Sequence, residues 1–446
     1  MNKKYSFKIF VFCSIIILVG LSVRTVFCSV CHGMTKQKQP LVSIAQIDRV
    51  LPSPKILNHF TKQEHASLQP VLQWEKVENA PIYELEIYAE NKKIFSSNRI
   101  YTAGYSVSLP QDVAGKNIYW HVRALNLDRS PITPYSEWET SFVDNSLPQK
   151  MVPQQTVDFN SGNGTNLLYP VYGWLPVQGA TKYEVEILSQ PPQQNEDTHP
   201  SIFRIGSGET TASDLYDEEK RNPNKPVYWR VRALKEDGEP LGSFSPAKKI
   251  VYPQKTYTVG TFGDSITHGG GAVSYSPGDW EYDYQSYLNF DTINLGRSGD
   301  TSASMLERFD QDVLPLHLQY LIIMGGTNSL RGGVSAKSVI DDLQAIKEKC
   351  EENGIMPIFL TLPPINPANI KRAFDQDTAL DWQRQFAMVN AYIKSQKHID
   401  IATKMTPDDG ILPTSLALDG LHPDVVGKKI MANIINEEWG NVIANI

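Results

Sequence analysis

Three features that often reveal a function are missing from this sequence. It contains no cluster of metal-ligating residues and no glycine-rich loop that would cradle a phosphate, so no metal and no cofactor are expected. It also contains no basic stripe interleaved with aromatic residues. The formal charge is −7, and the chain after residue 34 has 38 basic against 49 acidic residues, because Lys3, Lys4, Lys8 and Arg24 all precede it. Such a surface repels a phosphate backbone, so nucleic-acid binding is disfavoured.

Cysteine is scarce, with four in 446 residues. Cys350 falls on the apolar face of a predicted helix together with Leu343, which favours a buried core thiol. Cys28 and Cys31, followed by His32, match the haem-attachment pattern C-x-x-C-H. A polar stretch follows them where a helical domain with a second axial ligand would be needed. A local disulfide, or simple flanking sequence, is therefore the favoured interpretation.

Residues 1–33 are expected to be a signal peptide or an N-terminal membrane anchor. Lys3 and Lys4 precede an almost wholly apolar run from Ile9 to Val23. A bilayer span needs about 20 residues, so this run is marginal, and both cleavage and retention stay open. Either outcome places the rest of the chain outside the cytoplasm, secreted or at the cell surface, with the membrane contacted only through this segment.

An internal repeat determines the expected architecture of the middle of the chain. Tyr-Glu-Leu-Glu-Ile at residues 83–87 recurs as Tyr-Glu-Val-Glu-Ile at residues 183–187. Likewise, Tyr-Trp-His-Val-Arg-Ala-Leu at residues 119–125 recurs as Tyr-Trp-Arg-Val-Arg-Ala-Leu at residues 228–234. Apolar residues alternate with polar ones in these segments, which predicts half-buried antiparallel strands and excludes a continuous helix.

Two β-sandwich modules are therefore expected, at residues 64–146 and 147–253, after a linker at residues 34–63. They resemble fibronectin type III domains in an early core Trp, a Tyr-x-apolar-x-apolar strand and a late aromatic-x-Val-x-Ala strand. The corner position that is usually Tyr in that family holds Ile118 and Val227, so the wider sandwich class is the firmer expectation. Such modules are mostly spacers, and contact with a cell-surface glycan is the alternative.

Residues 254–446 show a different pattern, in which strands alternate with helices. Strands are predicted at residues 257–262, 292–295, 320–324 and 356–362, and helices at residues 302–312, 335–353 and 380–396. A last helix begins near Pro423 and is expected to bury Val426, Ile430, Ile434 and Trp439 or their neighbours. This predicts a three-layer α/β domain with a parallel sheet and with ligand at the carboxyl ends of the strands. We also expect a fragment that starts near Pro253 to fold and remain active.

A serine directly follows the first strand of this domain. Gly263-Asp264-Ser265 would display the serine hydroxyl on a tight turn at the carboxyl edge of the sheet. Asp419 and His422 lie three residues apart in a loop before the last helix. A serine nucleophile needs a base to take its proton, and the base needs a partner that holds its tautomer. One loop could supply both partners, and His268 is the nearest alternative base.

Two further segments follow strands, where an oxyanion hole would be built. Gly299 comes after the second strand, and Gly326-Thr327-Asn328 comes after the third. Glycine permits close backbone approach, and a side-chain amide supplies an additional hydrogen-bond donor.

These four blocks resemble, in order and location, those of the GDSL/SGNH hydrolases, and the resemblance covers essentially the whole segment after Lys255. The resemblance implies that Ser265 is the nucleophile and, through its backbone N–H, one oxyanion donor. Gly299 would be the second donor and Asn328 the third. His422 would be the base, and Asp419 would orient it.

The preferred substrate is an acylated carbohydrate or other ester, from which small acyl groups such as acetyl are removed. The family includes lipases, lysophospholipases, thioesterases and carbohydrate O-deacetylases. The loop after the nucleophile carries rings that would suit sugar faces or would pack against the next helix: Tyr275, Trp280, Tyr282, Tyr284 and Tyr287. A lysophospholipase or thioesterase is the alternative enzyme, and a surface adhesion protein is the alternative without catalysis. Ser329 departs from the family, which commonly has Asp there, and leaves the hydrogen bonding of that loop open.

Overall fold

The computed structural model describes residues 51–444, except residues 61–64, 149–150, 158–164, 195–196, 222–224, 251–255 and 273–274. The predicted signal or anchor segment, with Cys28 and Cys31, lies outside the described residues. Within the described ranges, the helices are either too short or too polar to cross a membrane.

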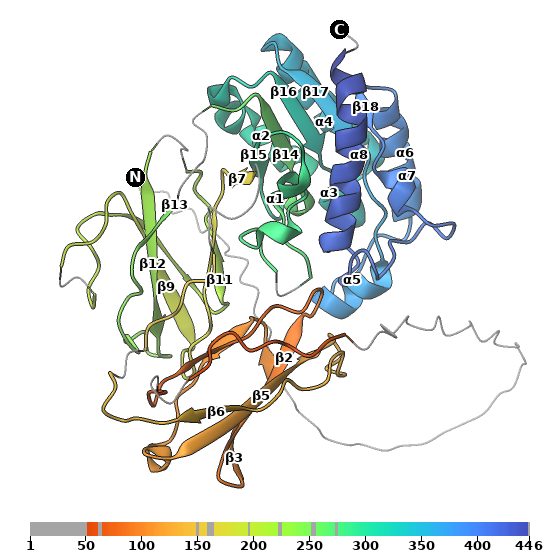
Figure 1. Cartoon of the computed structure of the whole chain (residues 1–446). Coiled ribbons are helices and arrows are strands. Elements are labelled where there is room, and N and C mark those ends of the chain that lie inside the picture. Colours follow the sequence, from red (N-terminus) through yellow and green to blue (C-terminus); the bar gives the residue numbers. More distant parts are fainter. Residues whose placement is uncertain are drawn as a thin grey trace, which may run out of the picture. The chain divides into compact units, whose positions relative to one another are not determined.

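The first module contains two antiparallel sheets that share one core (Figure 1). One sheet has the order β3-β2-β5-β6, and the other pairs β1 with β4. The elements are β1 (Val71–Gln73), β2 (Ile82–Ala89), β3 (Lys92–Ile100), β4 (Gly104–Ser106), the 3-10 helix η1 (Gln111–Val113), β5 (Asn117–Leu125) and β6 (Glu139–Phe142). Trp74, Leu85 and Trp120 are buried between the sheets, as the period-two alternation predicts.

The second module repeats this arrangement. Its four-stranded sheet has the order β10-β9-β12-β13, and its second sheet pairs β11 with β8. The strands are β8 (Val171–Gly173), β9 (Lys182–Leu188), β10 (Arg204–Thr210), β11 (Asp214–Tyr216), β12 (Val227–Leu234) and β13 (Lys248–Ile250). Trp174, Val185 and Trp229 form its core. The middle of the chain is therefore β-rich, as expected.

Part of the predicted linker, residues 34–63, belongs to the first module. Among its described residues, the Leu51 N–H donates to the Ile132 carbonyl at 3.1 Å, and the Leu57 N–H donates to the Gln73 carbonyl at 3.0 Å. The Ile56 side chain is buried in the module core. This segment differs from the expected free linker because its apolar side chains and backbone N–H groups find partners in the neighbouring strands.

The C-terminal domain is built on a parallel sheet with the order β18-β17-β16-β14-β15-β7. Five of these strands come from the predicted domain: β14 (Val259–Gly263), β15 (Thr292–Gly296), β16 (Tyr320–Met324), β17 (Met356–Leu360) and β18 (His398–Ile399). Burial along β14 to β17 is almost continuous, which is typical of a sheet covered on both faces. The predicted α/β class with a parallel sheet is confirmed.

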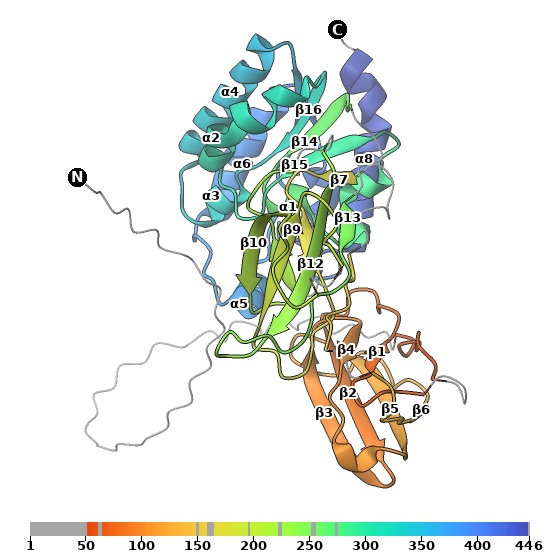
Figure 2. The ribbon, with the colours of Figure 1, turned by 90° about the vertical axis from the view of Figure 1, so that its left-hand side faces the viewer.

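Helices cover both faces of this sheet. Figure 2 shows α2, α4 and α6 on one face and α8 on the other, which gives three layers. The helical elements are α1 (Ser265–His268), η2 (Trp280–Tyr282), η3 (Tyr284–Tyr287), α2 (Ser302–Asp312), η4 (Leu314–Leu316), α3 (Thr327–Arg331), α4 (Ala336–Glu352), α5 (Pro367–Phe374), α6 (Trp382–Lys394), α7 (Ala402–Met405) and α8 (Val425–Ala444). Cys350 on α4 is a buried free thiol, as predicted.

The buried face of α8 agrees with the predicted one at Ile434, which is buried, and at Ile430 and Trp439, which pack against the core, but not at Val426. The helix begins at Val425, two residues after Pro423, and Val426 is 42% exposed. The face that packs on the sheet includes Val425 and Met431, together with the buried Lys428. A lysine stands on the inner face, and the apolar pattern alone placed Val426 there instead of its neighbour Val425.

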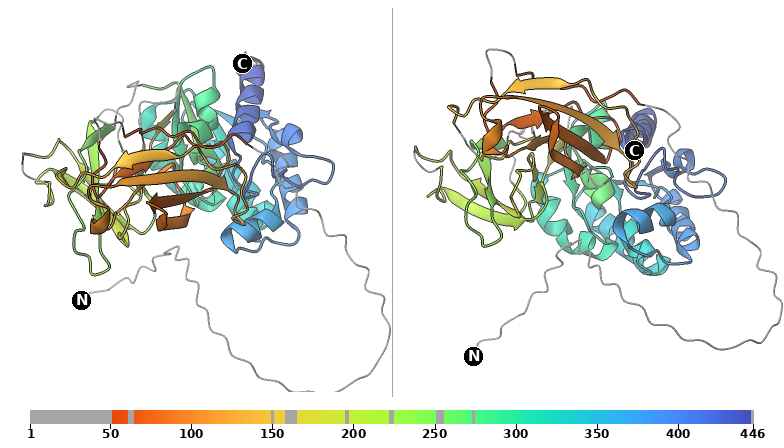
Figure 3. Two further views of the ribbon diagram at one scale, coloured as in Figure 1. Left: turned by 60° about the horizontal axis from the view of Figure 1, so that its bottom comes forward. Right: turned by 90° about the horizontal axis from the view of Figure 1, so that it is seen from below.

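A sixth strand, β7 (Thr165–Leu167), forms one edge of the parallel sheet although it precedes the second module's first strand. It pairs with β15, with Thr165 opposite Thr292 and Leu167 opposite Asn294. Its three residues are too few to show a periodicity, so the sequence assigned them to the second module. The C-terminal domain thus includes a strand from outside the predicted range of residues 254–446. Figure 3 shows the chain from two further directions.

Candidate active site

The turn after β14 displays Ser265 at the carboxyl edge of the sheet, where β14 lies between β15 and β16. Gly263 is required there because a Cβ at this position would lie 2.2 Å from the Met324 carbonyl oxygen. Asp264 caps α1 by accepting the Ile266 N–H at 3.0 Å through Oδ1. The serine therefore opens a helical turn whose backbone N–H groups face the strand ends.

His422 links Ser265 to Asp419, although the serine and the histidine are 157 residues apart in sequence. His422 Nε2 lies 2.9 Å from Ser265 Oγ, and His422 Nδ1 lies 2.8 Å from Asp419 Oδ2. The carboxylate can only accept, so Nδ1 carries the proton and Nε2 is left free to accept the serine proton. The structure thus brings the three sequence-predicted residues into one hydrogen-bonded chain.

Asp419 is fully buried and is held as an anion by its partners. Burial alone would raise the pKa of Asp419, but the neighbouring His422 and two backbone N–H groups leave this pKa below its ordinary value. Asp419 Oδ1 accepts the N–H groups of Leu421 and His422, each at 2.8 Å. The Asn366 N–H donates to the Gly420 carbonyl at 2.8 Å, which ties this loop to the segment after β17.

The predicted oxyanion donors lie on two neighbouring loops. Gly299 has φ +89° and is exposed, and no described atom lies within 4 Å of where a Cβ would be, beyond its chain neighbours. Asn328 Nδ2 donates to the carbonyl of Asp300 at 2.9 Å, and Asn328 Oδ1 accepts from Arg331 Nε at 3.0 Å. These contacts fix the orientation of the amide and engage one of the two Nδ2 hydrogens.

Ser329 takes part in a small hydroxyl network. Ser329 Oγ accepts the Ser302 N–H at 3.0 Å, and Ser302 Oγ donates to Asp342 Oδ2 at 2.6 Å. A carboxylate from α4 therefore anchors the network in which Ser329 takes part. The hydrogen bonding of this loop, which the sequence left open, therefore joins Ser329 to Ser302 and, through Ser302, to Asp342.

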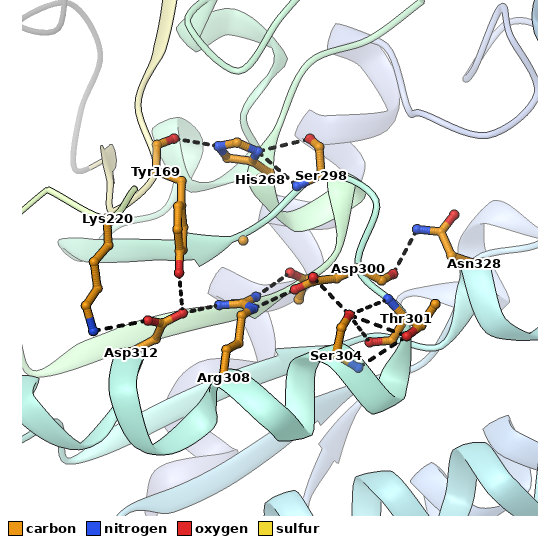
Figure 4. A network of polar contacts seen from close by, with 12 residues as sticks. Tyr169, Lys220, His268, Ser298, Asp300, Thr301, Ser304, Arg308, Asp312 and Asn328 are labelled. Carbon is orange, nitrogen blue, oxygen red and sulfur yellow. Dashed lines mark hydrogen bonds and ion pairs between the residues drawn. The ribbon is translucent and has the colours of Figure 1, made fainter. Parts of the chain in front are cut away.

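His268, the alternative base, has both ring nitrogens occupied by groups other than Ser265. Its Nε2 donates to the Tyr169 carbonyl at 2.8 Å, and its Nδ1 accepts the Ser298 N–H at 3.2 Å (Figure 4). Burial lowers the pKa of His268 to about 4. His268 is therefore a neutral structural histidine.

Most of the aromatic loop after the nucleophile packs inward. Tyr275, Tyr282 and Tyr284 are buried. Tyr275 and Tyr282 stack with centroids 4.0 Å apart, and the Tyr275 hydroxyl donates to the carbonyls of Val77 and Ala80. For these three rings the structure favours the packing alternative over the sugar-facing one, because the packing of the loop buries them.

Sequence reasoning missed a buried charged cluster behind the serine turn. Lys428 Nζ donates to the Ile266 carbonyl at 2.8 Å, and burial lowers the pKa of Lys428 to about 8. Burial raises the pKa of Asp264 to about 6 and that of Asp424 to about 7. Asp424 Oδ2 accepts the Leu418 N–H at 2.8 Å, just before the Asp419 loop. In the sequence, the only sign of this cluster was the four-residue spacing of Asp424 and Lys428, which places both on one otherwise apolar helix face.

The described part of the chain offers no group of three His, Cys, Asp or Glu side chains that could hold a metal ion. The site is made of a serine, an imidazole, a carboxylate and amide donors. This set can carry out acyl transfer with protein groups alone.

Residues 261–430 match the model of the GDSL-like Lipase/Acylhydrolase family. The chain therefore contains a GDSL-like lipase/acylhydrolase domain, which confirms the resemblance over this segment. A curated relative, the uncharacterized lipoprotein YqeF of Bacillus subtilis, is 33% identical over a segment that covers 25% of this chain and 50% of the relative. The chain thus spans about half the length of the curated relative that it matches.

Three solved structures are also similar. A GDSL-like lipase from Bacteroides thetaiotaomicron is 24% identical to this chain. The match covers 41% of this chain and 87% of the lipase chain, with a TM-score of 0.34. The lipase/acylhydrolase from Enterococcus faecalis is 20% identical, with coverages of 41% and 95% and a TM-score of 0.33. An acetylxylan esterase from Geobacillus stearothermophilus is 18% identical, with coverages of 41% and 93% and a TM-score of 0.32.

Proposed function

We propose that this protein is an extracytoplasmic serine esterase that forms an acyl-enzyme on Ser265. The observation that carries the proposal is the hydrogen-bonded chain from Ser265 Oγ through His422 to Asp419, with distances of 2.9 Å and 2.8 Å. Such a chain activates a hydroxyl that is otherwise a weak nucleophile. The location outside the cytoplasm rests on the predicted leader at residues 1–33.

The chemistry follows from the protonation states at the site. His422 Nε2 takes the Ser265 proton as Oγ forms a bond to the acyl carbon, and Asp419 stabilises the resulting imidazolium. The Ser265 and Gly299 N–H groups and the Asn328 amide donate to the acyl oxygen as it becomes negative. The alcohol then leaves with the proton from His422, and water repeats the sequence to release the acid.

We propose a small acyl group, such as acetyl, on a carbohydrate as the substrate. The support is the polarity of the groups around the oxyanion loop. Arg331, which contacts Asn328, also donates to Gln376 Oε1 at 2.8 Å, so two polar side chains border the Asn328 amide. A polar alcohol suits these groups better than a fatty chain does. Contact of the β modules with a surface glycan is part of the same proposal.

Fluorophosphonate labelling of the full chain tests the nucleophile. The probe should label the wild type at Ser265 and should leave Ser265→Ala unlabelled, and an adduct at another serine would exclude the assignment. An ester panel tests the substrate: acetylated sugars, p-nitrophenyl esters of rising chain length and a lysophospholipid. Highest kcat/KM on the lysophospholipid would favour the alternative enzyme, and absence of both labelling and turnover would favour a surface binding protein.

A further inference from the structure

Tyr169 lies outside the segment that matches the acylhydrolase family, yet it is buried in the core of the C-terminal domain. It stands two residues after β7, just before β8 of the second module, and is 5% exposed. Its backbone carbonyl, its hydroxyl and its ring each contact a different group, and all three sets of contacts lead to residues 297–300. Figure 4 shows the paths from the carbonyl and the hydroxyl.

The first path runs through the Tyr169 backbone. The Tyr169 carbonyl accepts from His268 Nε2 at 2.8 Å, which fixes the tautomer so that Nδ1 is an acceptor. Nδ1 then accepts the Ser298 N–H at 3.2 Å and lies 3.0 Å from Ser298 Oγ. The residue directly before Gly299 is thereby held through a neutral, buried imidazole.

The second path runs through the Tyr169 hydroxyl. It donates to Asp312 Oδ2 at 2.7 Å, and the same oxygen accepts from Arg308 at 2.9 Å. The Nε of Arg308 donates to Asp300 Oδ2 at 2.5 Å, and its NH2 donates to the Gly263 carbonyl at 3.1 Å. The residue directly after Gly299 is thereby held by a buried guanidinium with carboxylates on two sides.

Two further contacts involve residues 297–300: Arg297 lies over the ring of Tyr169, and Asp300 accepts a hydrogen bond from the Asn328 amide. The Arg297 guanidinium carbon lies 5.4 Å from the centroid of the Tyr169 ring. The Asp300 carbonyl accepts from Asn328 Nδ2 at 2.9 Å. Displacement of Asp300 would therefore move both the Gly299 N–H and the Asn328 amide.

We propose that Tyr169 is a positioning residue for the oxyanion-binding loop, residues 297–300, so that the segment joining β7 to the second module takes part in catalysis. The inference rests on the proposed esterase function. Oxyanion donors act only if they are held where the charge develops, and a displacement of about 1 Å can cost about 100-fold in rate. Tyr169 touches no reacting atom and acts by clamping Gly299 from both sides.

Tyr169→Phe in the full chain removes the hydroxyl path and keeps the ring and the backbone path. With p-nitrophenyl acetate, kcat should fall about tenfold, a fraction of the cost of losing one whole oxyanion donor, while KM stays within about twofold. The inhibition constant of an alkylboronate, whose tetrahedral adduct places an oxygen in the oxyanion hole, should rise about tenfold as well.

Tyr172→Phe is the matched control. Tyr172 is also buried, and its hydroxyl donates to Asp217 Oδ2 at 2.6 Å. That carboxylate is likewise paired with an arginine, Arg221. This variant should lose similar stability and keep the wild-type kcat and boronate affinity. If Tyr169→Phe is insoluble, His268→Ala breaks the other path and should show the same selective loss of kcat.

If the wild type is active and Tyr169→Phe keeps the wild-type kcat and boronate affinity, the positioning role of Tyr169 is overturned. The proposed esterase function would then still stand. Equal losses of kcat in the Tyr169→Phe and Tyr172→Phe variants would overturn the positioning role too, because they would reflect general destabilisation. A wild type that neither turns over esters nor labels at Ser265 would overturn the proposed function, and the inference with it.

Discussion

His422 Nε2 lies 2.9 Å from Ser265 Oγ, although these two residues stand at opposite ends of the C-terminal domain's sequence. His422→Ala should therefore lose nearly as much kcat as Ser265→Ala, since a nucleophile and its base act as a unit. Asp419→Ala should lose less, because the Ser–His pair remains. Steady-state kinetics on p-nitrophenyl acetate measure this order, and near-normal activity in His422→Ala would identify another base.

The amide of Asn328 should contribute to kcat. Its Nδ2 has one hydrogen engaged by the Asp300 carbonyl and one left for substrate, so Asn328→Ala should lower kcat about 10²–10³-fold with little effect on KM. Asn353→Ala is the control, because Asn353 Nδ2 also donates to a backbone carbonyl, that of Lys349, at an exposed helix end. A loss of similar size in both variants would contradict a specific oxyanion role.

His268 should contribute less to stability at acidic pH than at neutral pH. Burial lowers its pKa from 6.5 to about 4, so the unfolded chain binds more protons than the folded one between these pH values. The stabilisation is fully present above pH 6.5 and is lost as the pH falls toward 4, a change of about 3 kcal/mol. The raised pKa values of Asp264 and Asp424 act in the opposite direction, so the effect of His268 is read from the difference in unfolding free energy between the wild type and His268→Gln. Urea unfolding across this range should show this difference shrink as the pH falls. An equally steep slope in that variant would assign the effect to other groups.

A fragment that starts at Pro253 should lose most of its activity, contrary to the expectation from the sequence. It lacks β7 and Tyr169, which leaves the edge of β15 unpaired and the Ser298 and Asp300 contacts unsupported. A fragment that starts at Met151 keeps both and should retain more activity. The melting temperatures and kcat values of the two fragments test this prediction. Full activity in the fragment that starts at Pro253 would show that β7 is dispensable for catalysis.

The sequence predicted the elements of the C-terminal domain well because each is long enough to show its own period. The helix predicted at residues 302–312 coincides with α2, and the strand predicted at residues 320–324 coincides with β16. Ser265, Gly299 and Asn328 came from short motifs at strand ends, whose meeting point follows from the parallel topology, and Asp419 and His422 came from a motif in the loop before the last helix. The structure places Ser265, His422 and Asp419 together, and their catalytic roles remain proposals.

What the sequence could not predict depends on contacts between distant segments. The hydrogen bond between Tyr169 and Asp312 joins residues 143 apart, and that between His268 and Tyr169 joins residues 99 apart. Periodicity describes how one element faces its surroundings and carries no information on such pairings. The choice between a sugar-facing and a packed position for Tyr275 and Tyr282 stayed open for the same reason, since a ring suits a core as well as a binding face.

The position of β7 has a consequence for how the protein is synthesised. Thr165 pairs with Thr292, so the ribosome must add 127 further residues before this strand has its partner. During that time the second module can fold, because its sheets need no residue beyond Ile250. The parallel sheet is then completed by a long-range pairing, a slow kind of folding step. The edge strand β7 therefore waits for a partner that is made long after it, and the second module can be complete before the sheet of the catalytic domain is.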